Sequence, residues 1–315
     1  MNPVKAARRA ARVCRRLASL CVHLSWGLLL AGWLRSRLGP SWFRHPRGET
    51  RRRRWQQALG DILGLRVHID GRPMDERGLL VANHVSWLDI VAIASATPTT
   101  FLAKDDVRAW PIVGWLGQWS GTIFLRRANL GALGAAIDAL VEVIEHGQRV
   151  ALFPEGTTSE GRGVGPFHRG LFQAAVKTGA PVQAIAVRYR RAGELDAIAP
   201  FIGEDAFVPH LLRVMAEPNT EVQLHFQAPL HGRQRRDLAL RAEGQVRAAL
   251  GVRDSSTLPR EAPGAERSAA LQPRADDQPQ HGQGPDDHRA GGQIEQARDQ
   301  QPQAVTARAQ AVGRR

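Results

Sequence analysis

The chain has 315 residues, enough for one large domain with appendages, and a formal net charge of +13. Residues 1–54 contain fourteen Lys or Arg and one acid, Glu49, whereas residues 55–252 contain twenty basic and twenty acidic residues. A nucleic-acid-binding domain usually carries its basic residues on the folded body, so this distribution disfavours nucleic acid as a partner. Cys14 and Cys21, the only cysteines, provide neither a disulfide framework nor zinc-site spacing.

The basic arm contains an apolar segment, Leu17–Leu34, with arginines on both sides. As a helix this segment is about 27 Å long, near the lower limit for crossing a bilayer. We expect residues 1–54 to anchor the protein on an anionic membrane surface. In this interpretation the helix lies in the cytoplasmic leaflet, Trp26 and Trp33 lie at headgroup depth, and the arginines contact anionic lipid. A single span and a buried core helix are the alternatives, and the flanking charge gives no orientation.

Residues 55–252 alternate short apolar strands with helical segments. The predicted strands are Leu65–Ile69, Leu79–Ala82, Thr99–Ala103, Thr122–Leu125, Arg149–Phe153, Val182–Val187 and Val222–Phe226. The predicted helices are Trp55–Gly64, Leu88–Ala96, an apolar stripe from Leu130 to Ile144, Gly170–Thr178 and Arg236–Leu250. This alternation predicts an α/β domain with a largely parallel or mixed central sheet flanked by helices. The tryptophan-rich segment 109–121 fits either an acyl-chain or membrane contact or ordinary packing.

Residues 253–315 differ in composition from the preceding body. They contain five Leu, Ile or Val and no Phe, Trp or Tyr, amid Gln, Ala, Pro, Asp and Arg. So little apolar surface does not offset the entropy lost on ordering the segment. We therefore expect a disordered C-terminal tail.

A histidine and an aspartate follow the predicted strand Leu79–Ala82. They are His84 and Asp89, five residues apart. Residues i and i+5 of a helix point about 140° apart. The two side chains therefore meet only if His84 lies in the turn before the helix and Asp89 in its first turns. A histidine held by a carboxylate is a general base; the alternative interpretation is a hydrogen-bonded structural histidine.

Four segments, in order, resemble the sequence blocks of the glycerolipid acyltransferases typified by 1-acylglycerol-3-phosphate acyltransferase. Residues 83–89 (NHVSWLD) are similar to the NHxSxxD block of that family. Residues 121–127 (GTIFLRR), 153–157 (FPEGT) and 180–187 (APVQAIAV) are similar to the second, third and fourth blocks. Four blocks in the same order are far more specific than any one of them.

The resemblance implies a membrane-associated O-acyltransferase. His84 takes the proton of a lyso-lipid hydroxyl that attacks an acyl thioester, and Asp89 orients His84. The acyl donor is acyl-CoA or acyl carrier protein, and no other cofactor and no metal is implied. The implied location is a bacterial inner (cytoplasmic) membrane, with the active site facing the cytoplasm. The residues implied to bind the acceptor are Arg127, which binds its phosphate, Glu155, Gly156, Thr157 and the additional cations Arg126 and Arg169.

The foremost acceptor implied by the resemblance is 1-acylglycerol-3-phosphate (lysophosphatidate), giving phosphatidate. Two departures bear on this choice: Arg126 replaces a frequent acid, and Thr158 replaces the usual arginine of the third block. Lyso-ornithine lipid, with a carboxylate in its head group, is therefore the alternative acceptor for the same chemistry. A third interpretation, from another class, is a non-catalytic basic protein that binds membranes or nucleic acid.

Overall fold

A computed structural model describes residues 3–39, 45–104, 122–125 and 132–252, together with Gly114 and Gly117. Contacts divide the chain into two units, Met1–Pro259 and Arg260–Arg315, and all the described residues belong to the first. The predicted tail, 253–315, lies outside the described residues. So does all of the tryptophan-rich segment except Gly114 and Gly117.

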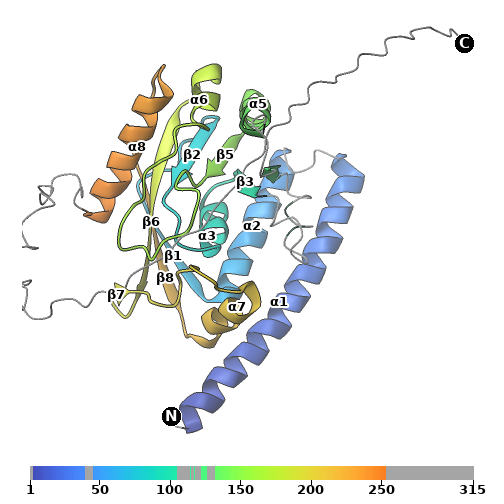
Figure 1. Cartoon of the computed structure of the whole chain (residues 1–315). Helices are drawn as coiled ribbons and strands as arrows, with labels where there is room; N and C mark the ends of the chain where they lie inside the picture. Colours follow the sequence, from blue (N-terminus) through green and yellow to red (C-terminus); the bar gives the residue numbers. More distant parts are fainter. Residues whose placement is uncertain are drawn as a thin grey trace, which may run out of the picture. The chain divides into compact units, whose positions relative to one another are not determined.

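An eight-stranded sheet forms the centre of the first unit, in the order β1-β8-β6-β2-β5-β3-β4, with β7 paired to β6 (Figure 1). The strands are β1 Leu65–Asp70, β2 Gly78–Ala82, β3 Thr100–Lys104, β4 Ile123–Leu125, β5 Arg149–Leu152, β6 Val182–Arg191, β7 Glu194–Leu195 and β8 Thr220–Phe226. Strands β6, β2, β5, β3 and β4 are parallel, whereas β7 and β8 are antiparallel to β6. The predicted mixed α/β sheet is confirmed.

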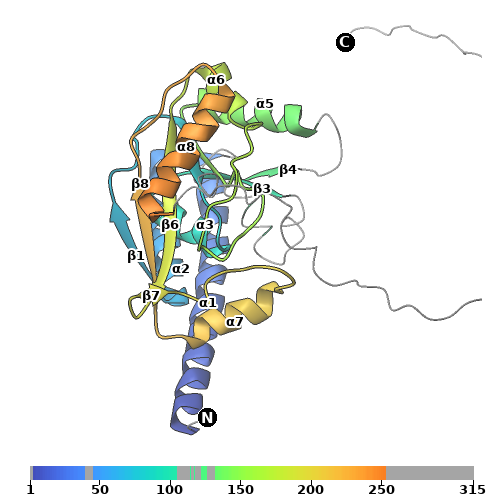
Figure 2. The same cartoon turned by 60° about the vertical axis from the view of Figure 1, so that its left-hand side comes forward.

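Helices cover both faces of this sheet (Figures 1 and 2). One face carries α1 Pro3–Leu38, α2 Pro46–Leu63, α3 Leu88–Ala96 and α7 Phe207–Ala216, and the other carries α5 Ala132–Glu145, α6 Gln173–Thr178 and α8 Arg235–Leu250. Successive residues of β2 serve the two cores: Leu80 packs toward α3, and Leu79 and Val81 pack toward α5. Because both faces of β2 are buried, its sequence is apolar throughout.

The N-terminal helices are longer than predicted. The apolar segment 17–34 is the second half of α1, which begins at Pro3, and α2 begins at Pro46 instead of Trp55. Proline suits the first position of a helix, and Glu49 in the first turn of α2 favours the positive end of the helix dipole. The boundary expected at residue 54 therefore falls within a continuous helix. Helix α7 and the short strand β7 were not predicted.

The basic half of α1 is attached to α7. Arg16 is buried, and its guanidinium donates to three backbone oxygens at the C-terminal end of α7, those of Met215 (3.0 Å), Glu217 (2.6 Å) and Pro218 (2.7 Å). Arg12 donates to the Ala216 carbonyl, and Arg9 pairs with the Glu217 carboxylate. A cation at the C-terminal end of a helix satisfies carbonyls that have no partner within the helix. Three of the arginines expected to contact lipid thus contact protein.

Gly64 makes room for this contact. It ends α2 with a φ of +84°, and a Cβ at this position would lie 2.1 Å from Nη2 of Arg16. Glycine adopts this left-handed conformation without strain. The turn between α2 and β1 therefore requires glycine both for its backbone conformation and for the guanidinium that lies against it.

We expect Arg16→Ala to destabilise the fold. The substitution leaves three carbonyl oxygens without their charged donor, and we expect it to lower the free energy of unfolding by about 3 kcal/mol. The measurement is urea denaturation of the purified chain. Arg15→Ala, which removes an exposed arginine of the same helix turn, should change stability by less than about 0.5 kcal/mol. Equal effects of the two substitutions would show that the α1–α7 contact does not stabilise the protein.

Candidate active site

The candidate site lies at one edge of the sheet, where several parallel strands end. Strand β2 ends at Ala82, two residues before His84, and its neighbour β5 ends at Leu152, just before the turn that contains Glu155. Strand β4 ends in the same direction at Leu125. In α/β folds the residues that follow the carboxyl ends of parallel strands form the usual ligand site.

His84 and Asp89 meet at this edge. His84 lies in the turn after β2, and Asp89 is the second residue of α3, as the spacing predicted. Nδ1 of His84 lies 2.8 Å from Oδ2 of Asp89, which also accepts the backbone N–H groups of Val85 (2.8 Å) and Ser86 (3.1 Å). The aspartate thus fixes the turn that presents the histidine as well as the histidine ring.

The His84 ring is held so that its other nitrogen is available. With Nδ1–H donating to the carboxylate, the neutral ring carries its lone pair on Nε2, where a general base needs it. The ring stacks on Phe153, with centroids 4.0 Å apart, and 19% of the His84 side chain is exposed, whereas Asp89 is completely buried. This arrangement can take a proton from a group approaching at the sheet edge.

Glu155 fixes the backbone of His84 from the neighbouring strand end. Its Oε1 accepts the His84 N–H and its Oε2 accepts the Gly165 N–H, both at 2.9 Å. Burial raises the pKa of the Glu155 carboxyl, and these two hydrogen bonds oppose the rise. Glu155 was predicted to contact the acceptor, which stays a prediction; in the structure both its oxygens bind backbone.

Strand β6 supports the turn through two further contacts, one made by Asn83 and one by Tyr189. The Asn83 amide pairs with the backbone of Val187, donating to its carbonyl (2.9 Å) and accepting its N–H (2.7 Å). The Tyr189 hydroxyl donates to Oδ1 of Asp89 at 2.6 Å. Burial and the neighbouring carboxylate raise the Tyr189 pKa well above 10, so the phenol remains a donor.

The remaining predicted site residues are placed only in part. Gly156, with a φ of +73°, and Thr157 are exposed in the turn after β5, and Arg169 is exposed beyond it. Arg126 and Arg127 lie outside the described residues. Among the described residues, no group of three or more His, Cys, Asp or Glu side chains is arranged to hold a metal ion.

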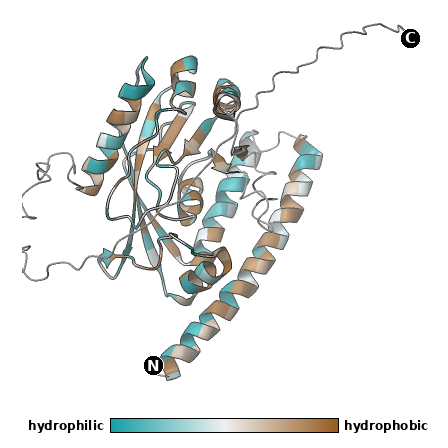
Figure 3. Cartoon of the chain, in the orientation of Figure 1, coloured by the Kyte–Doolittle hydropathy of each residue, from teal (hydrophilic) through white to brown (hydrophobic). Residues whose placement is uncertain are grey.

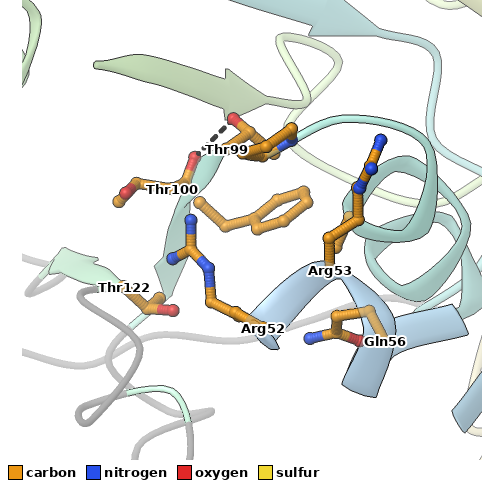
Figure 4. Close-up of a pocket in the computed structure, with 9 residues that line it drawn as sticks. Arg52, Arg53, Gln56, Thr99, Thr100 and Thr122 are labelled. Atoms are coloured by element: carbon orange, nitrogen blue, oxygen red, sulfur yellow. Dashed lines mark hydrogen bonds between the residues drawn. The ribbon is translucent and has the colours of Figure 1, made fainter. Parts of the chain in front are cut away.

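A cavity at the other end of the sheet is separate from this site. Its walls come from α2 and from the start of β3, and Figure 4 shows Arg52 reaching from α2 toward Thr100. Thr100 begins β3, whereas His84 follows the carboxyl end of a parallel strand, so the two regions lie at opposite edges. We therefore assign the cavity no part in the site.

Comparison with known proteins decides the family. An acyltransferase family model matches residues 64–188. The lyso-ornithine lipid O-acyltransferase of Pseudomonas aeruginosa is 39% identical over 243 residues, which make up 76% of this chain and 93% of that protein. The chain belongs to the glycerolipid acyltransferase family. It is therefore an acyltransferase, as the four sequence blocks predicted.

Two further similarities agree with this assignment. The 1-acyl-sn-glycerol-3-phosphate acyltransferase of Neisseria meningitidis is 45% identical to this acyltransferase over 130 residues, 40% of this chain and 50% of that protein. The crystal structure of the 1-acyl-sn-glycerophosphate acyltransferase PlsC from Thermotoga maritima aligns with a TM-score of 0.58 and 22% identity, covering 78% of this chain and 96% of that one. At this identity the structural similarity shows a shared fold.

The contacts of Trp87 with α7 were not predicted from the sequence of this acyltransferase. Trp87 Nε1–H donates to Nδ1 of the buried His210 at 3.0 Å, and His210 Nε2 lies 3.0 Å from the Pro200 carbonyl, to which it donates. The Trp87 ring also packs edge-on against Phe207. Because Trp87 lies in the turn between His84 and the start of α3, α7 supports the turn that carries His84. The helical spacing of the apolar residues in α7 is the sequence signal that could have indicated this helix.

We expect this contact to make the fold sensitive to acid. Burial lowers the pKa of His210; the hydrogen bond to the Pro200 carbonyl and the nearby Asp205 oppose this shift, and Arg213 adds to it. A lowered pKa in the folded state means that stability is complete above the unfolded-state value of about 6.5 and is lost as pH falls through the folded-state value. The expected loss is up to about 1.4 kcal/mol per pH unit.

The test compares melting temperatures from pH 8 to pH 5. His210→Gln keeps an acceptor for Trp87 and a donor for Pro200 but does not titrate, so its acid-side loss should be smaller than that of the wild type. His68→Gln removes an exposed histidine of β1 and should behave as the wild type does. An unchanged pH dependence in His210→Gln would contradict the assignment.

Proposed function

We propose that this acyltransferase moves a fatty acyl group from an acyl thioester to the hydroxyl of a lyso-lipid, with His84 as general base. His84 takes the proton of the acceptor hydroxyl as its oxygen attacks the thioester carbonyl. The carbon–sulfur bond then breaks, and the leaving thiolate receives the proton. The 2.8 Å contact between His84 Nδ1 and Asp89 Oδ2 carries this proposal, because it leaves Nε2 as the acceptor of a proton and stabilises the imidazolium that forms. The donor is acyl-CoA or acyl carrier protein.

The acceptor that we favour is lyso-ornithine lipid, the alternative rather than the foremost choice of the sequence interpretation. The support comes from relatives of that name, which match over most of their length: 93% for the Pseudomonas aeruginosa protein and 84% for one from Brucella abortus. Thr158 stands where the third block usually has arginine, and its hydroxyl donates to the Phe201 carbonyl. A cation expected for a phosphate head group is therefore missing from the third block.

Lysophosphatidate is the second candidate acceptor. It is favoured by the 45% identity to the Neisseria meningitidis enzyme, although that match spans only half of the relative. For either acceptor we propose that Arg127, with Arg126 and Arg169 as further cations, binds the head-group anion, and that Gly156 and Thr157 line the same region. A guanidinium can bind two oxygens of a phosphate or carboxylate at once.

We expect the acyl-transfer assay to separate these acceptors. Membranes containing the protein receive labelled acyl-CoA or acyl carrier protein, with lyso-ornithine lipid and lysophosphatidate offered side by side. Labelling of the ornithine lipid should dominate and should fall at least about 100-fold in His84→Ala, because loss of a positioned base removes that much catalysis. In Arg127→Ala the KM for the acceptor should rise while the KM for the donor stays unchanged.

His168→Ala is the control for His84→Ala, because His168 is an exposed histidine of the neighbouring loop. It should leave most of the activity in place. Product from lysophosphatidate alone would reverse the order of the two acceptors without affecting the role of His84. Acyl transfer that persists in His84→Ala would refute the proposed base, and activity with neither lipid would refute both acceptors.

We propose further that α1 attaches the enzyme to the cytoplasmic face of the bacterial inner membrane. Within the described residues α1 is the one helix long and apolar enough to span a bilayer. Its C-terminal half exposes the apolar side chains Val22, Trp26, Leu29 and Trp33 at helical spacing. Figure 3 shows several hydrophobic, brown turns along α1. The Arg51 guanidinium lies 4.9 Å from the Trp33 ring centroid. An exposed apolar stripe with nearby arginines suits a helix lying at an anionic surface.

Vesicle flotation tests this membrane proposal. We expect Val22→Asp with Leu29→Asp to reduce flotation with vesicles containing anionic lipid by about tenfold or more, because charge replaces buried apolar area. Val22 and Leu29 are 71% and 68% exposed; the control, Leu240→Asp, changes a leucine of α8 that is 59% exposed. Undiminished flotation of the double variant would mean that another surface binds the membrane.

A further inference from the structure

Tyr189 reaches the catalytic turn because β6 is longer than its neighbour. The last paired residues of β2 and β6 are Ala82 and Ile185, and β6 continues to Arg191 along β8. Tyr189 lies in this extension, on the face that packs against α3. Since β2 has already ended, the space beside the extension is occupied by the turn that carries His84.

The Tyr189 hydroxyl completes the hydrogen bonding of Asp89. Oδ2 of Asp89 receives the His84 ring and two backbone N–H groups, whereas Oδ1 receives the Tyr189 hydroxyl at 2.6 Å. Among the described residues, this phenol is the one donor to Oδ1. Both side chains are buried, so a lost hydroxyl leaves Oδ1 without a partner in a site where hydrogen bonds to charge are strong.

We propose that Tyr189 is a positioning residue for the His84–Asp89 pair, holding the carboxylate so that Oδ2 faces His84 Nδ1 and reducing the charge that the carboxylate presents to the ring. This inference rests on the proposed role of His84 as base. The hydrogen bond of the Tyr189 phenol is to Asp89. Its effect passes through Asp89, as the effect of the aspartate passes through the histidine.

Loss of the hydroxyl has two expected consequences. The Asp89 carboxylate is less firmly oriented, so His84 is less often held in the orientation that accepts the proton of the acceptor hydroxyl. As a result, kcat falls. The carboxylate also attracts the ring proton more strongly, so the acid limb of the kcat/KM profile moves to higher pH. The charged and titratable groups that face this pair are Asp89 from α3, Glu155 from the turn after β5, Tyr189 itself and Asp196, which faces Tyr189. None of these except Tyr189 is changed in the variant.

The first experiment is Tyr189→Phe in the full chain, assayed with the donor and acceptor that give His84-dependent product. We expect kcat to fall roughly 10-fold with KM little changed, and the acid limb to move upward by a few tenths of a pH unit to about one unit. Ser95→Ala is the matched control: it removes another buried hydroxyl, which donates to the Ala92 carbonyl at the far end of α3. It should move neither kcat nor the pH profile.

The second measurement uses a property of this chain: Tyr189 is its only tyrosine. Biosynthetic replacement of tyrosine by 3-fluorotyrosine therefore labels this position alone and keeps the shape of the core. We expect one ¹⁹F resonance, which shifts in Asp89→Asn and stays in place in Ser95→Ala. This readout needs no catalysis and remains informative if Tyr189→Phe folds poorly.

The outcomes separate this inference from the proposed function. Product that survives His84→Ala refutes the base, whatever Tyr189 does. If His84→Ala abolishes product while Tyr189→Phe keeps the wild-type kcat and acid limb, His84 stands as the base and the positioning role of Tyr189 is overturned. A ¹⁹F resonance that does not shift in Asp89→Asn also overturns the positioning role of Tyr189.

Discussion

The buried carboxylate of Asp89 is the interaction on which the site depends. A charge without access to water is costly unless donors satisfy it, and here four donors, three from residues 84–86 and one from Tyr189 in β6, converge on one side chain. These hydrogen bonds fix the position of the histidine ring, of the turn that carries it and of the adjacent strand β6. The same carboxylate that holds the His84 ring therefore holds the end of β2, the start of α3 and the extension of β6 together.

Helix α1 joins two kinds of surface in one element. Its first half is basic and is bound to the end of α7 through arginine side chains, whereas its second half exposes an apolar stripe. Charge alone does not distinguish an arginine that attracts lipid from one that binds protein. The contacts of these arginines divide α1 into a first half that is part of the folded domain and a second half whose apolar stripe is free to contact a membrane. Since α7 also contacts Trp87, α1 is connected through α7 to the turn that carries His84.

The sequence predicted the features that depend on local pattern. Alternating apolar strands and helices predicted the sheet, and the five-residue spacing of His84 and Asp89 predicted a strand–turn–helix junction. It could not predict bonds between distant residues: 71 positions separate Glu155 from His84, 100 separate Tyr189 from Asp89 and 199 separate Arg16 from Met215. The expectation that Arg16 contacts lipid was wrong. Within a basic segment the sequence does not distinguish an arginine that binds backbone carbonyls from one that is exposed to lipid. The start of α2 was predicted too late because residues 51–54 were assigned with the other arginines to the membrane-anchoring arm, whereas α2 begins at Pro46.

The close approach of Arg16 to Gly64 has a consequence for how the sequence can vary. A side chain at position 64 would occupy the space of the guanidinium, so a substitution there must also displace Arg16 from its carbonyl partners. Loss of the arginine removes this obstacle but leaves a backbone conformation at position 64 that still favours glycine. The two positions therefore constrain each other unequally.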